Sequence, residues 1–596
     1  MSERIKWLGL VSLSSLVAIS ASAMPVSSDV SEETLRLRDP SRQMLGLCGG
    51  SRRAGELLRM RLQYAQEAMA NMPAGAGKPI LFPGLGTLQY PVTTSNAEAQ
   101  RFFDQGMMLT YGFNNGEAIR SFQEAQRLDP QCAMCWWGEA LAHGPNINAP
   151  MDPEVNAQAV AATQRAVALK AKAKPVEQAL IDALATRYSA DPKADRAALD
   201  KGYAERMLQV AERFPQDDNV AVLAAEAVMD TQPWDYWEAD RKTPKGNIVK
   251  AISLVEGVLK RNPDHPQADH LYIHLMEASV HPERAESYAD RLATPLVPAA
   301  GHLVHMPAHL YYRVGRFKDS IRVNVDAAKA DEAYLKNAAN PGLYRFGYYP
   351  HNVHFIVTSA QMAGDMKTAI EQAEKLRGIV DVDVTSKVAW LQPVSAAPYL
   401  AYSQFAAPKD IMALKAPDER LPYVSGMWRY ARAVAHAQEK DKAAFDRELA
   451  ALRAIREGTD FKPMVDQGVP APDLLRLAET VAQARLAYAQ GKYGKAVDLY
   501  RQAVAIEEAI PYMEPPYWYY PVKQSLGAAL YRSGDLAGAR QAFMEALAQA
   551  PNNGWALYGL ARTQRTMGDR SGAAASEAAL TNAWLGDRRW LVLDRL

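Results

Sequence analysis

The hydrophobic positions of this 596-residue chain recur at helical spacing along most of its length. Alanine-rich amphipathic runs are separated by short breaks that carry proline, as at Asn262-Pro263, Asp191-Pro192 and Phe214-Pro215. Proline disfavours the continuation of a helix, and no stretch shows the alternation of apolar and polar residues that a half-buried strand needs. The pattern therefore predicts an all-α protein built from many consecutive helices.

One arrangement of small and aromatic residues occurs near both ends of the chain. Residues 98–131 carry it at Gly106, Ala118, Phe122, Ala125 and Pro130. Residues 520–553 carry it at Gly527, Ala539, Phe543, Ala546 and Pro551, and residues 554–585 give a weaker copy. Small residues let two helices approach, the aromatic ring fills the gap, and proline stops the second helix. In these places the chain resembles the tetratricopeptide-repeat (TPR) family, which implies a TPR-like α-α solenoid (superhelix).

These signals divide the chain into six parts. They are a signal peptide (1–23), an N-terminal helix and covering loop (24–96), N-terminal TPR-like repeats (97–200), diverged helical repeats with a histidine-rich site (201–380), helical linker repeats (381–480) and C-terminal TPR repeats (481–596). The second part is loop-rich, with a helix expected from about Arg53 to Asn71. An aromatic-rich insert at 330–350 interrupts the repeat period, and such inserts often lie on a binding face.

The first 23 residues have the pattern of a cleavable secretory signal. Arg4 and Lys6 precede an apolar run that is short for a membrane span, and Ala21-Ser22-Ala23 follows it. We expect cleavage near Ala23 and a periplasmic or secreted protein without stable membrane insertion. An uncleaved signal anchor is the alternative.

Charge and cysteine content narrow the function classes. Lys+Arg and Asp+Glu are both 67, and a balanced charge argues against nucleic acid or an anionic membrane as the main partner. The three cysteines, Cys48, Cys132 and Cys135, are too few for a disulfide-built scaffold. Cys132 and Cys135 can pair with each other or one can pair with Cys48, and buried thiols are the other possibility.

Histidines are concentrated in one part of the chain. Nine of the eleven lie between His265 and His354, where an even spread would place about two. They form pairs at helical spacing: His270 with His274, His305 with His309, and His351 with His354. The first two pairs are 35 residues apart, which is close to the period of a two-helix repeat. Because imidazole is the commonest protein ligand of metals, this spacing indicates a metal site.

The local context of each pair suggests how it is presented. His270, His274 and Glu277 share one helix face, and two imidazoles with a carboxylate suit zinc or non-haem iron. Pro307 favours a helix start, so that His302 and His305 lie in the entry segment. An earlier helix start would instead place His302, His305 and His309 on one face.

Neighbouring packed helices lie about 8–10 Å apart, so the 270/274 and 305/309 pairs are predicted to share one divalent ion: zinc, iron or copper. His351 and His354 lie one helix further on and join only if the solenoid curls tightly or the insert folds them back. A two-metal site is less favoured. The alternative for the whole cluster is a structural hydrogen-bond network. His265 and His281 each precede a proline and are expected to be structural. His143 and His436 are isolated, and His436 is expected to lie at the surface or to serve in packing.

The other candidate residues depend on the metal hypothesis. Glu277 or Asp269 would be a further ligand, an orienting group or a general base in a metal-dependent hydrolase or oxidase. Tyr272, Tyr311 and Tyr312 would line the site of an oxidase. Trp234 and Asp235 lie in a polar and aromatic loop expected to bind a small molecule, and a pocket closed by Trp234, Trp237 and the tyrosines is a third possibility.

Motifs over most of residues 85–375 extend the resemblance. G-H-x-x-H-M-P-x-H, Y-I-H-x-x-E, P-W-D-Y-W, G-P-N-I-N and P-H-N-x-H together resemble a group of exported bacterial TPR proteins. The resemblance implies an all-α solenoid and no particular reaction. TPR arrays also offer a concave surface for proteins or peptides, so a periplasmic adaptor without catalysis is the rival hypothesis.

Overall fold

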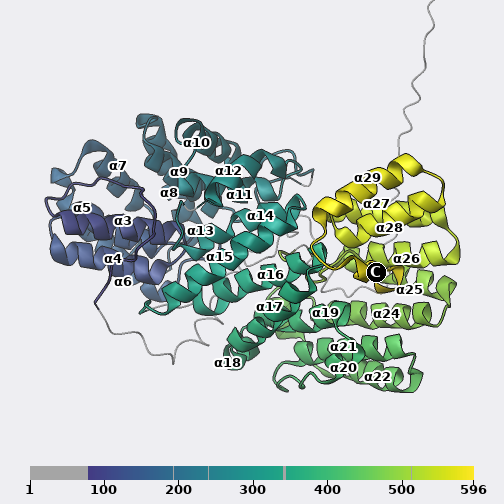
Figure 1. Ribbon diagram of the computed structural model, residues 1–596. Coiled ribbons are helices and arrows are strands. Elements are labelled where there is room, and N and C mark those ends of the chain that lie inside the picture. The colour runs from purple at the N-terminus through teal and green to yellow at the C-terminus, as the bar shows by residue number, and fades with distance from the viewer. Residues whose placement is uncertain (1–77, 192, 239, 295, 340–343, 512) are drawn as a thin grey trace, which may run out of the picture.

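The computed structural model describes residues 78–596, apart from residues 192, 239, 295, 340–343 and 512. Within these residues the regular elements are helices, with two isolated β-bridges and no strand. Each long helix packs against the next one in the chain, and the array winds through the molecule as a solenoid (Figure 1). The prediction of an all-α, TPR-like α-α solenoid is confirmed. The predicted signal peptide, Cys48 and the helix expected from Arg53 to Asn71 lie outside the described residues.

The N-terminal helices form the first stack in Figure 1. They are α3 (Ala97–Tyr111), α4 (Asn115–Leu128), α5 (Ala133–Ala142), α6 (Asn156–Leu169), α7 (Pro175–Leu184), α8 (Arg196–Arg213) and α9 (Asp218–Asp230). Residues 78–96 have no regular secondary structure and run beside α3. There, Phe82 N–H donates to Gln105 Oε1 at 2.7 Å and Tyr90 N–H donates to Asp104 Oδ1 at 2.9 Å.

The middle helices carry the histidines. They are α10 (Ile248–Arg261), α11 (Pro266–Glu277), α12 (Glu286–Leu292), α13 (Gly301–His305), α14 (Pro307–Arg313), α15 (Phe317–Leu335), α16 (Tyr349–Ala363) and α17 (Met366–Ile379). Of the aromatic-rich insert expected at 330–350, Tyr334 lies in α15, and Tyr344–Tyr348 forms a single π-helical turn that leads directly into α16.

The C-terminal helices complete the array. They are α18 (Val382–Lys387), α19 (Gln392–Phe405), α20 (Pro408–Met412), α21 (Pro422–Glu439), α22 (Lys442–Gly458), α23 (Lys462–Asp466), α24 (Ala471–Ala489), α25 (Tyr493–Ala509), α26 (Val522–Ser533), α27 (Leu536–Gln549), α28 (Gly554–Thr566) and α29 (Arg570–Ala583). No helix in the described part of the chain is long and apolar enough to cross a bilayer.

The repeated glycines and phenylalanines interlock as the sequence predicts. A Cβ added to Gly106 or Gly138 would lie 2.6 or 2.4 Å from the ring of Phe122. At the other end, a Cβ on Gly527 or Gly559 would lie 2.8 or 2.2 Å from Phe543. In each case one ring from the second helix of a repeat fills space between its own first helix and the first helix of the next repeat. This packing fixes the close spacing of neighbouring repeats.

The array curls back so that its C-terminal repeats meet the histidine-bearing helices. The Trp555 indole N–H of α28 donates to Gln361 O of α16 at 2.9 Å, and Leu585 N–H donates to Ala363 O at 2.9 Å. Asn552 Nδ2 donates to Gly315 O at 3.3 Å, between α14 and α15. Segments about 200 residues apart in sequence therefore pack against each other.

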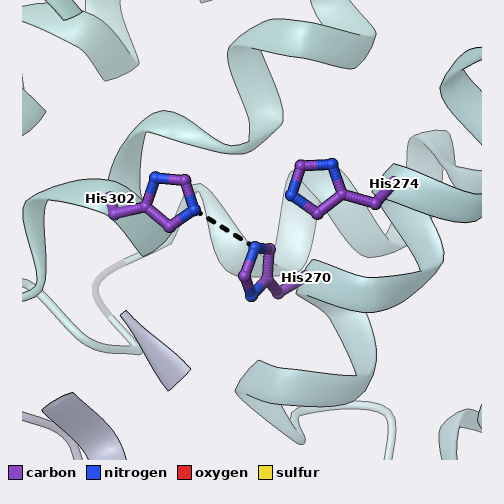
Figure 2. Close-up of side chains that lie close together, drawn as sticks. All are labelled: His270, His274 and His302. Carbon is purple, nitrogen blue, oxygen red and sulfur yellow. Dashed lines mark hydrogen bonds between the residues drawn. The ribbon is translucent and has the colours of Figure 1, made fainter. Parts of the chain in front are cut away.

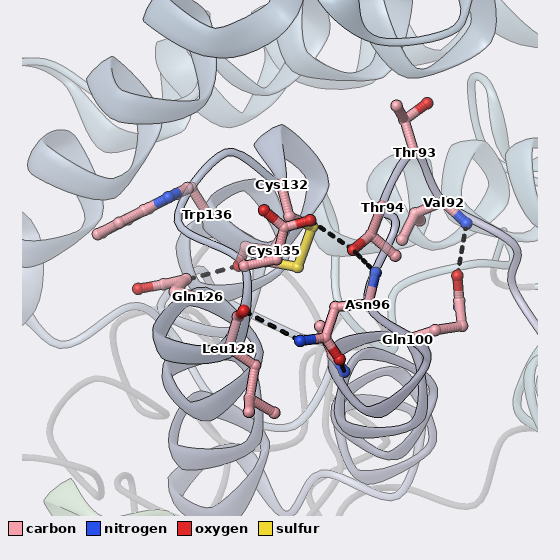
Figure 3. Close-up of a disulfide and its surroundings, with 12 residues drawn as sticks. Val92, Thr93, Thr94, Asn96, Gln100, Gln126, Leu128, Cys132, Cys135 and Trp136 are labelled. Carbon is pink, nitrogen blue, oxygen red and sulfur yellow. Dashed lines mark hydrogen bonds between the residues drawn. A yellow bond between two sulfur atoms is a disulfide. The ribbon is translucent and has the colours of Figure 1, made fainter.

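Cys132 and Cys135 form a disulfide at the start of α5 (Figure 3). Cys132 is the residue before the helix, and its sulfur accepts from Cys135 N–H. The bond lies beside the end of α4, where Asn96 Nδ2 donates to Leu128 O at 3.1 Å. Both cysteines are buried, so the disulfide belongs to the core of the first repeats.

Candidate metal centre

Six of the clustered histidines form two buried triads. The first triad consists of His270 and His274 from α11 and His302 from α13, whose rings turn toward one another in Figure 2. The second triad consists of His305 from α13, His309 from α14 and His351 from α16. In each triad, one ligand nitrogen per ring lies within 4.8 Å of the others. Each triad therefore has the residue types and the spacing of a three-ligand metal site.

The local sequence explains which ring enters which triad. His270 and His274 are one helical turn apart on α11 and share a face. The chain from Gly301 to Arg313 is broken into two short helices, because Pro307 begins α14 and α13 ends at His305. His302 and His305 are both helical, three residues apart, and belong to different triads.

The two triads adjoin each other. The ring centroids of His274 and His309 are 6.0 Å apart, and those of His302 and His305 are 6.1 Å apart. Within the triads, neighbouring rings are separated by 4.7 Å for His305 and His309 and by 5.0 Å for His270 and His302. The six imidazoles form one continuous cluster.

The outer nitrogens of several rings are held by polar side chains. His270 Nδ1 lies 3.0 Å from Gln267 Oε1, and His305 Nδ1 lies 2.5 Å from Asn324 Oδ1. His274 Nδ1 lies 2.8 Å from Glu277 Oε1. An oxygen acceptor at Nδ1 fixes the proton there and leaves the Nε2 lone pair for another partner, as is usual around metal-binding histidines.

Glu277 links the two triads through its two carboxylate oxygens. Oε1 contacts His274 of the first triad, and Oε2 lies 3.0 Å from His309 Nδ1 of the second. Glu514 Oε2, from the segment between α25 and α26, lies 2.9 Å from the same nitrogen. Burial alone would lower the pKa of His309, but the two carboxylates outweigh burial and raise this pKa to about 10. Glu277, His309 and Glu514 also form a third group of possible ligands, which would use Nδ1 of His309.

The other five rings of the triads are neutral at pH 7. Desolvation lowers the pKa of each well below its usual value, and neighbouring imidazoles add to the effect. All six rings are at most 3% exposed. A neutral imidazole has a lone pair to give to a cation, so burial prepares these rings for ligation.

Several of the remaining ring nitrogens lack a hydrogen-bond partner. Among the described residues, none pairs with the buried Nε2 atoms of His274, His305, His309 and His351. In the first triad, His270 Nε2 and His302 Nε2 are 3.2 Å apart, drawn as the dashed line in Figure 2. Two nitrogens bound tetrahedrally to one zinc ion would be about 3.4 Å apart, given Zn–N bonds of about 2.1 Å. The geometry of this pair therefore fits two ligands of one ion as well as a direct hydrogen bond.

Aromatic side chains cover both triads. Phe113, from the turn between α3 and α4, lies 5.1 Å from His270 and 4.8 Å from His302 between ring centroids. Phe355 of α16 lies 5.0 Å from each ring of the second triad. Trp234 packs edge-on against His274 at 4.7 Å, while its indole N–H donates to Ile147 O. These rings exclude water and would strengthen any charge interaction inside.

Four other residues expected at the site have other contacts. Tyr272 donates to Glu256 Oε1 at 2.6 Å, and Tyr311 donates to Asp290 Oδ1 at 2.7 Å. Asp235 pairs with Lys245 Nζ at 2.5 Å. His354 Nε2 lies 2.6 Å from the Tyr519 hydroxyl and belongs to none of the three groups of possible ligands in the described residues.

Asp269 and Tyr312 border the cluster without joining a triad. Asp269 is fully buried, and desolvation raises its pKa to about 9. Neither carboxylate oxygen of Asp269 has a hydrogen-bond partner among the described residues. Tyr312 lies three residues after His309, and its ring packs on Phe355 at 5.8 Å.

Three polar residues that hold the rings were not anticipated from the sequence: Gln267, Asn324 and Glu514. Gln267 lies three residues before His270, a spacing that could have revealed it. Glu514 is 205 residues away from His309. Its only sequence signal is the Pro- and aromatic-rich stretch around it, which lengthens the connection between two repeat helices.

The grouping differs from the shared site expected for His270, His274, His305 and His309. The structure divides these four between two triads and completes each triad with a third ring, His302 or His351. His351 joins because α16 packs on α15 and brings the start of α16 to α13 and α14.

No protein-family model and no curated protein matches the sequence. Solved structures with a similar course include human IFIT1 bound to m7Gppp-AAAA, at 12% identity and a TM-score of 0.27, over 89% of this chain and 95% of that one. Yeast Tom70 has 10% identity and a TM-score of 0.25, and the match covers 81% of this chain and 89% of Tom70. Naa15/Naa10 bound to HypK-THB has 14% identity and a TM-score of 0.20, and the match covers 89% of this chain and 75% of that one. These likenesses concern the fold alone.

Proposed function

We propose that this protein binds two divalent transition-metal ions, one in each histidine triad. The observation that carries the proposal is the second triad, in which His305, His309 and His351 each bury an Nε2 without a partner among the described residues. A buried polar atom without a partner costs about 1–3 kcal/mol. One cation would satisfy these three atoms together: the neutral rings of His305 and His351 offer lone pairs, and the ion would displace the Nε2 proton of His309, whose pKa is raised. A hydrogen-bond network would have to supply a separate partner for each nitrogen.

The surroundings support a metal site more than a structural network. Outer oxygens hold Nδ1 of four rings, and Glu277 holds one ring of each triad. Such carboxylate–imidazole contacts orient the ring and make it a better electron donor. Imidazole suits zinc, iron and copper, so the ligand types do not choose among them.

The number of ligands bears on catalysis. Structural zinc sites are usually closed by four protein ligands, whereas catalytic sites keep three and leave one position open. A bound ion with an open position would supply Lewis-acid activation of water or a redox couple. A metal-dependent hydrolase or oxidase is therefore the functional class that we propose, with Glu277 orienting His274 and His309.

Export to the periplasm or the cell exterior is part of the proposal. The signal-like residues 1–23 support it, and so does the disulfide between Cys132 and Cys135, since such bonds persist in oxidising compartments. The rival function is a docking platform for a protein or peptide. It is supported by the solenoid fold, which offers extended surface to partners.

Elemental analysis of the protein, purified without a histidine tag after growth with zinc, iron and copper, tests the proposal. We expect close to two metal ions per chain. His351→Ala should remove only the ion of the second triad, and His270→Ala only that of the first. His281→Ala is the matched control, because His281 lies at the surface beside Glu283.

A folded wild-type protein that contains no metal and takes up none on titration would refute metal binding. If it also captured a partner protein reproducibly, the docking function would stand in its place. Loss of metal in His281→Ala would show that the cluster is not the binding site.

A further inference from the structure

A cavity adjoins the second triad. It has a volume of 410 Å³ and lies between α14 and the segment that joins α25 to α26. Tyr312 and Arg313 line it, three and four residues after His309 on the same short helix. Arg313 Nε lies 4.0 Å from Glu514 Oε1, and the other oxygen of Glu514 contacts His309. The cavity is thus separated from the triad by one layer of side chains.

Two guanidinium groups give one side of the cavity a positive charge. Arg313 donates to Glu277 O at 3.2 Å and lies near Glu514, as described above. Arg241, from the loop after Trp237, lines the same cavity, and no described residue forms a hydrogen bond or ion pair with its guanidinium group. Burial and the nearby charge of Arg313 lower the pKa of Arg241, and the charge of Glu514 offsets part of this effect. A partly buried cation beside a second cation favours an anionic ligand.

The acidic residues of the cavity do not cancel this charge. Glu508 pairs with Lys523 at 2.8 Å. Burial raises the pKa of Glu507 to about 8, so that this group is largely uncharged at pH 7. Glu514 Oε2 lies 2.9 Å from His309 Nδ1, so this oxygen is directed at the triad. The charge of Glu514 acts on Arg241, but no described residue lining the cavity forms an ion pair with the Arg241 guanidinium group.

The rest of the wall is apolar and aromatic. Pro511, Met513, Pro516 and Trp518 line it, and the Trp518 side chain is buried. The Trp518 indole N–H has no acceptor among the described residues, although it is shielded from water. The volume lies in the range of about 300–1,000 Å³ that is usual for small-molecule sites.

We propose that this cavity binds an organic carboxylate with an apolar or aromatic body, its carboxylate at Arg241 and Arg313 and its body against Pro511, Met513, Pro516 and Trp518. The idea that such an acid is the substrate of the adjoining metal centre rests on the proposed metal function. Binding itself does not need the metal, because the lining residues named here are separate from the triads. The carboxylate is either that of a free small acid or the C-terminus of a peptide.

Matched acids and amides test this site by isothermal titration calorimetry. The probes are 3-phenylpropionate, N-acetylphenylalanine and a decapeptide ending in phenylalanine, each with its neutral amide. We expect at least one acid to bind at least about tenfold more tightly than its amide, the effect of one charge-assisted hydrogen-bond pair. Tight binding of the decapeptide acid would assign the source as a peptide C-terminus, and binding of the small acids alone would assign a free acid.

Arg241→Gln should abolish the preference for the acid, and Arg540→Gln, at an exposed position of α27, should leave it unchanged. Circular dichroism and metal content check that the Arg241→Gln protein is folded. Equal binding of acids and amides, no binding of any probe, or an unchanged preference in Arg241→Gln would overturn the inference.

Each titration is run on metal-free and on metal-loaded protein, so that the two proposals fail separately. If the protein holds two ions but binds none of the acids, only the proposed carboxylate site is refuted. A protein that binds the acid through Arg241 but takes up no metal overturns the metal function alone.

Discussion

At the residue scale, Gly301 is the position on which the histidine motif depends. A Cβ at this position would lie 1.8 Å from Asp331 Oδ1 and 3.0 Å from the Tyr344 hydroxyl. Asp331 is fully buried and accepts from Tyr344 at 2.6 Å and from Asn352 Nδ2 at 2.7 Å. Gly301 immediately precedes His302, and Asn352 immediately follows His351. The carboxyl group of Asp331 therefore packs against the backbone that presents one ring of each triad.

Gly301→Ala is expected to destabilise the protein by about 1–3 kcal/mol, because either α13 or Asp331 must move. Thermal unfolding followed by circular dichroism should show a lower Tm, and the metal content should fall with it. Gly378→Ala is the control, since Gly378 lies in α17 with no atom within 4 Å of an added Cβ. That change should be neutral or should stabilise by up to about 1 kcal/mol. An unchanged Tm in Gly301→Ala would contradict the account of this contact.

At the scale of elements, α11 supplies two ligands and their shared outer carboxylate. His270, His274 and Glu277 follow one another at i, i+4 and i+7, so that one stripe of the helix faces the cluster. This stripe was predictable from the sequence, because helical spacing alone defines it. The conformation of the segment from Gly301 to His309 was not predictable in the same way. Whether His302 and His305 are helical depends on where α13 begins, and Pro307 alone does not fix that position.

Glu277→Gln is expected to lower the affinity for both metal ions by about 10–100-fold, which is the usual cost of losing a carboxylate that holds a ligand. The reason is that each oxygen of Glu277 holds a ring of a different triad. Metal titration of the purified protein measures the two affinities. Glu283→Gln is the matched control, because that carboxylate is exposed and contacts only His281 among the histidines described. An effect confined to one ion would show that Glu277 does not serve both triads.

At the scale of the whole molecule, the curl of the solenoid completes the second triad's surroundings. Glu514 comes from the C-terminal repeats and reaches His309 of α14, while Trp555 holds α28 against α16. A solenoid gains its curvature from small rotations summed over many repeats. Contacts of this kind therefore tie distant repeats into one unit around the histidines.

Glu514→Gln is expected to lower the affinity of the second triad for its ion by about tenfold or more. The affinity of the first triad should not change. Glu514 contacts His309 and none of the first triad's rings among the contacts described. Metal titration should then show one unchanged and one weakened site. Glu508→Gln, in the same region but paired with Lys523, serves as the control. Equal weakening of both sites would mean that Glu514 acts through the fold rather than through His309.

The local features of this protein follow from its amino-acid sequence alone. The repeated Gly, Ala and Phe positions specify closely packed helix pairs, and the histidine spacing on α11 specifies one ligand face, because each depends only on helix periodicity and side-chain size. The packing of distant helices sets the rest: six rings form two triads rather than one shared site, His351 takes part and His354 does not, and Glu514 reaches His309. Those outcomes depend on how the helices are placed in space, which is a sum over many repeats that no local pattern records.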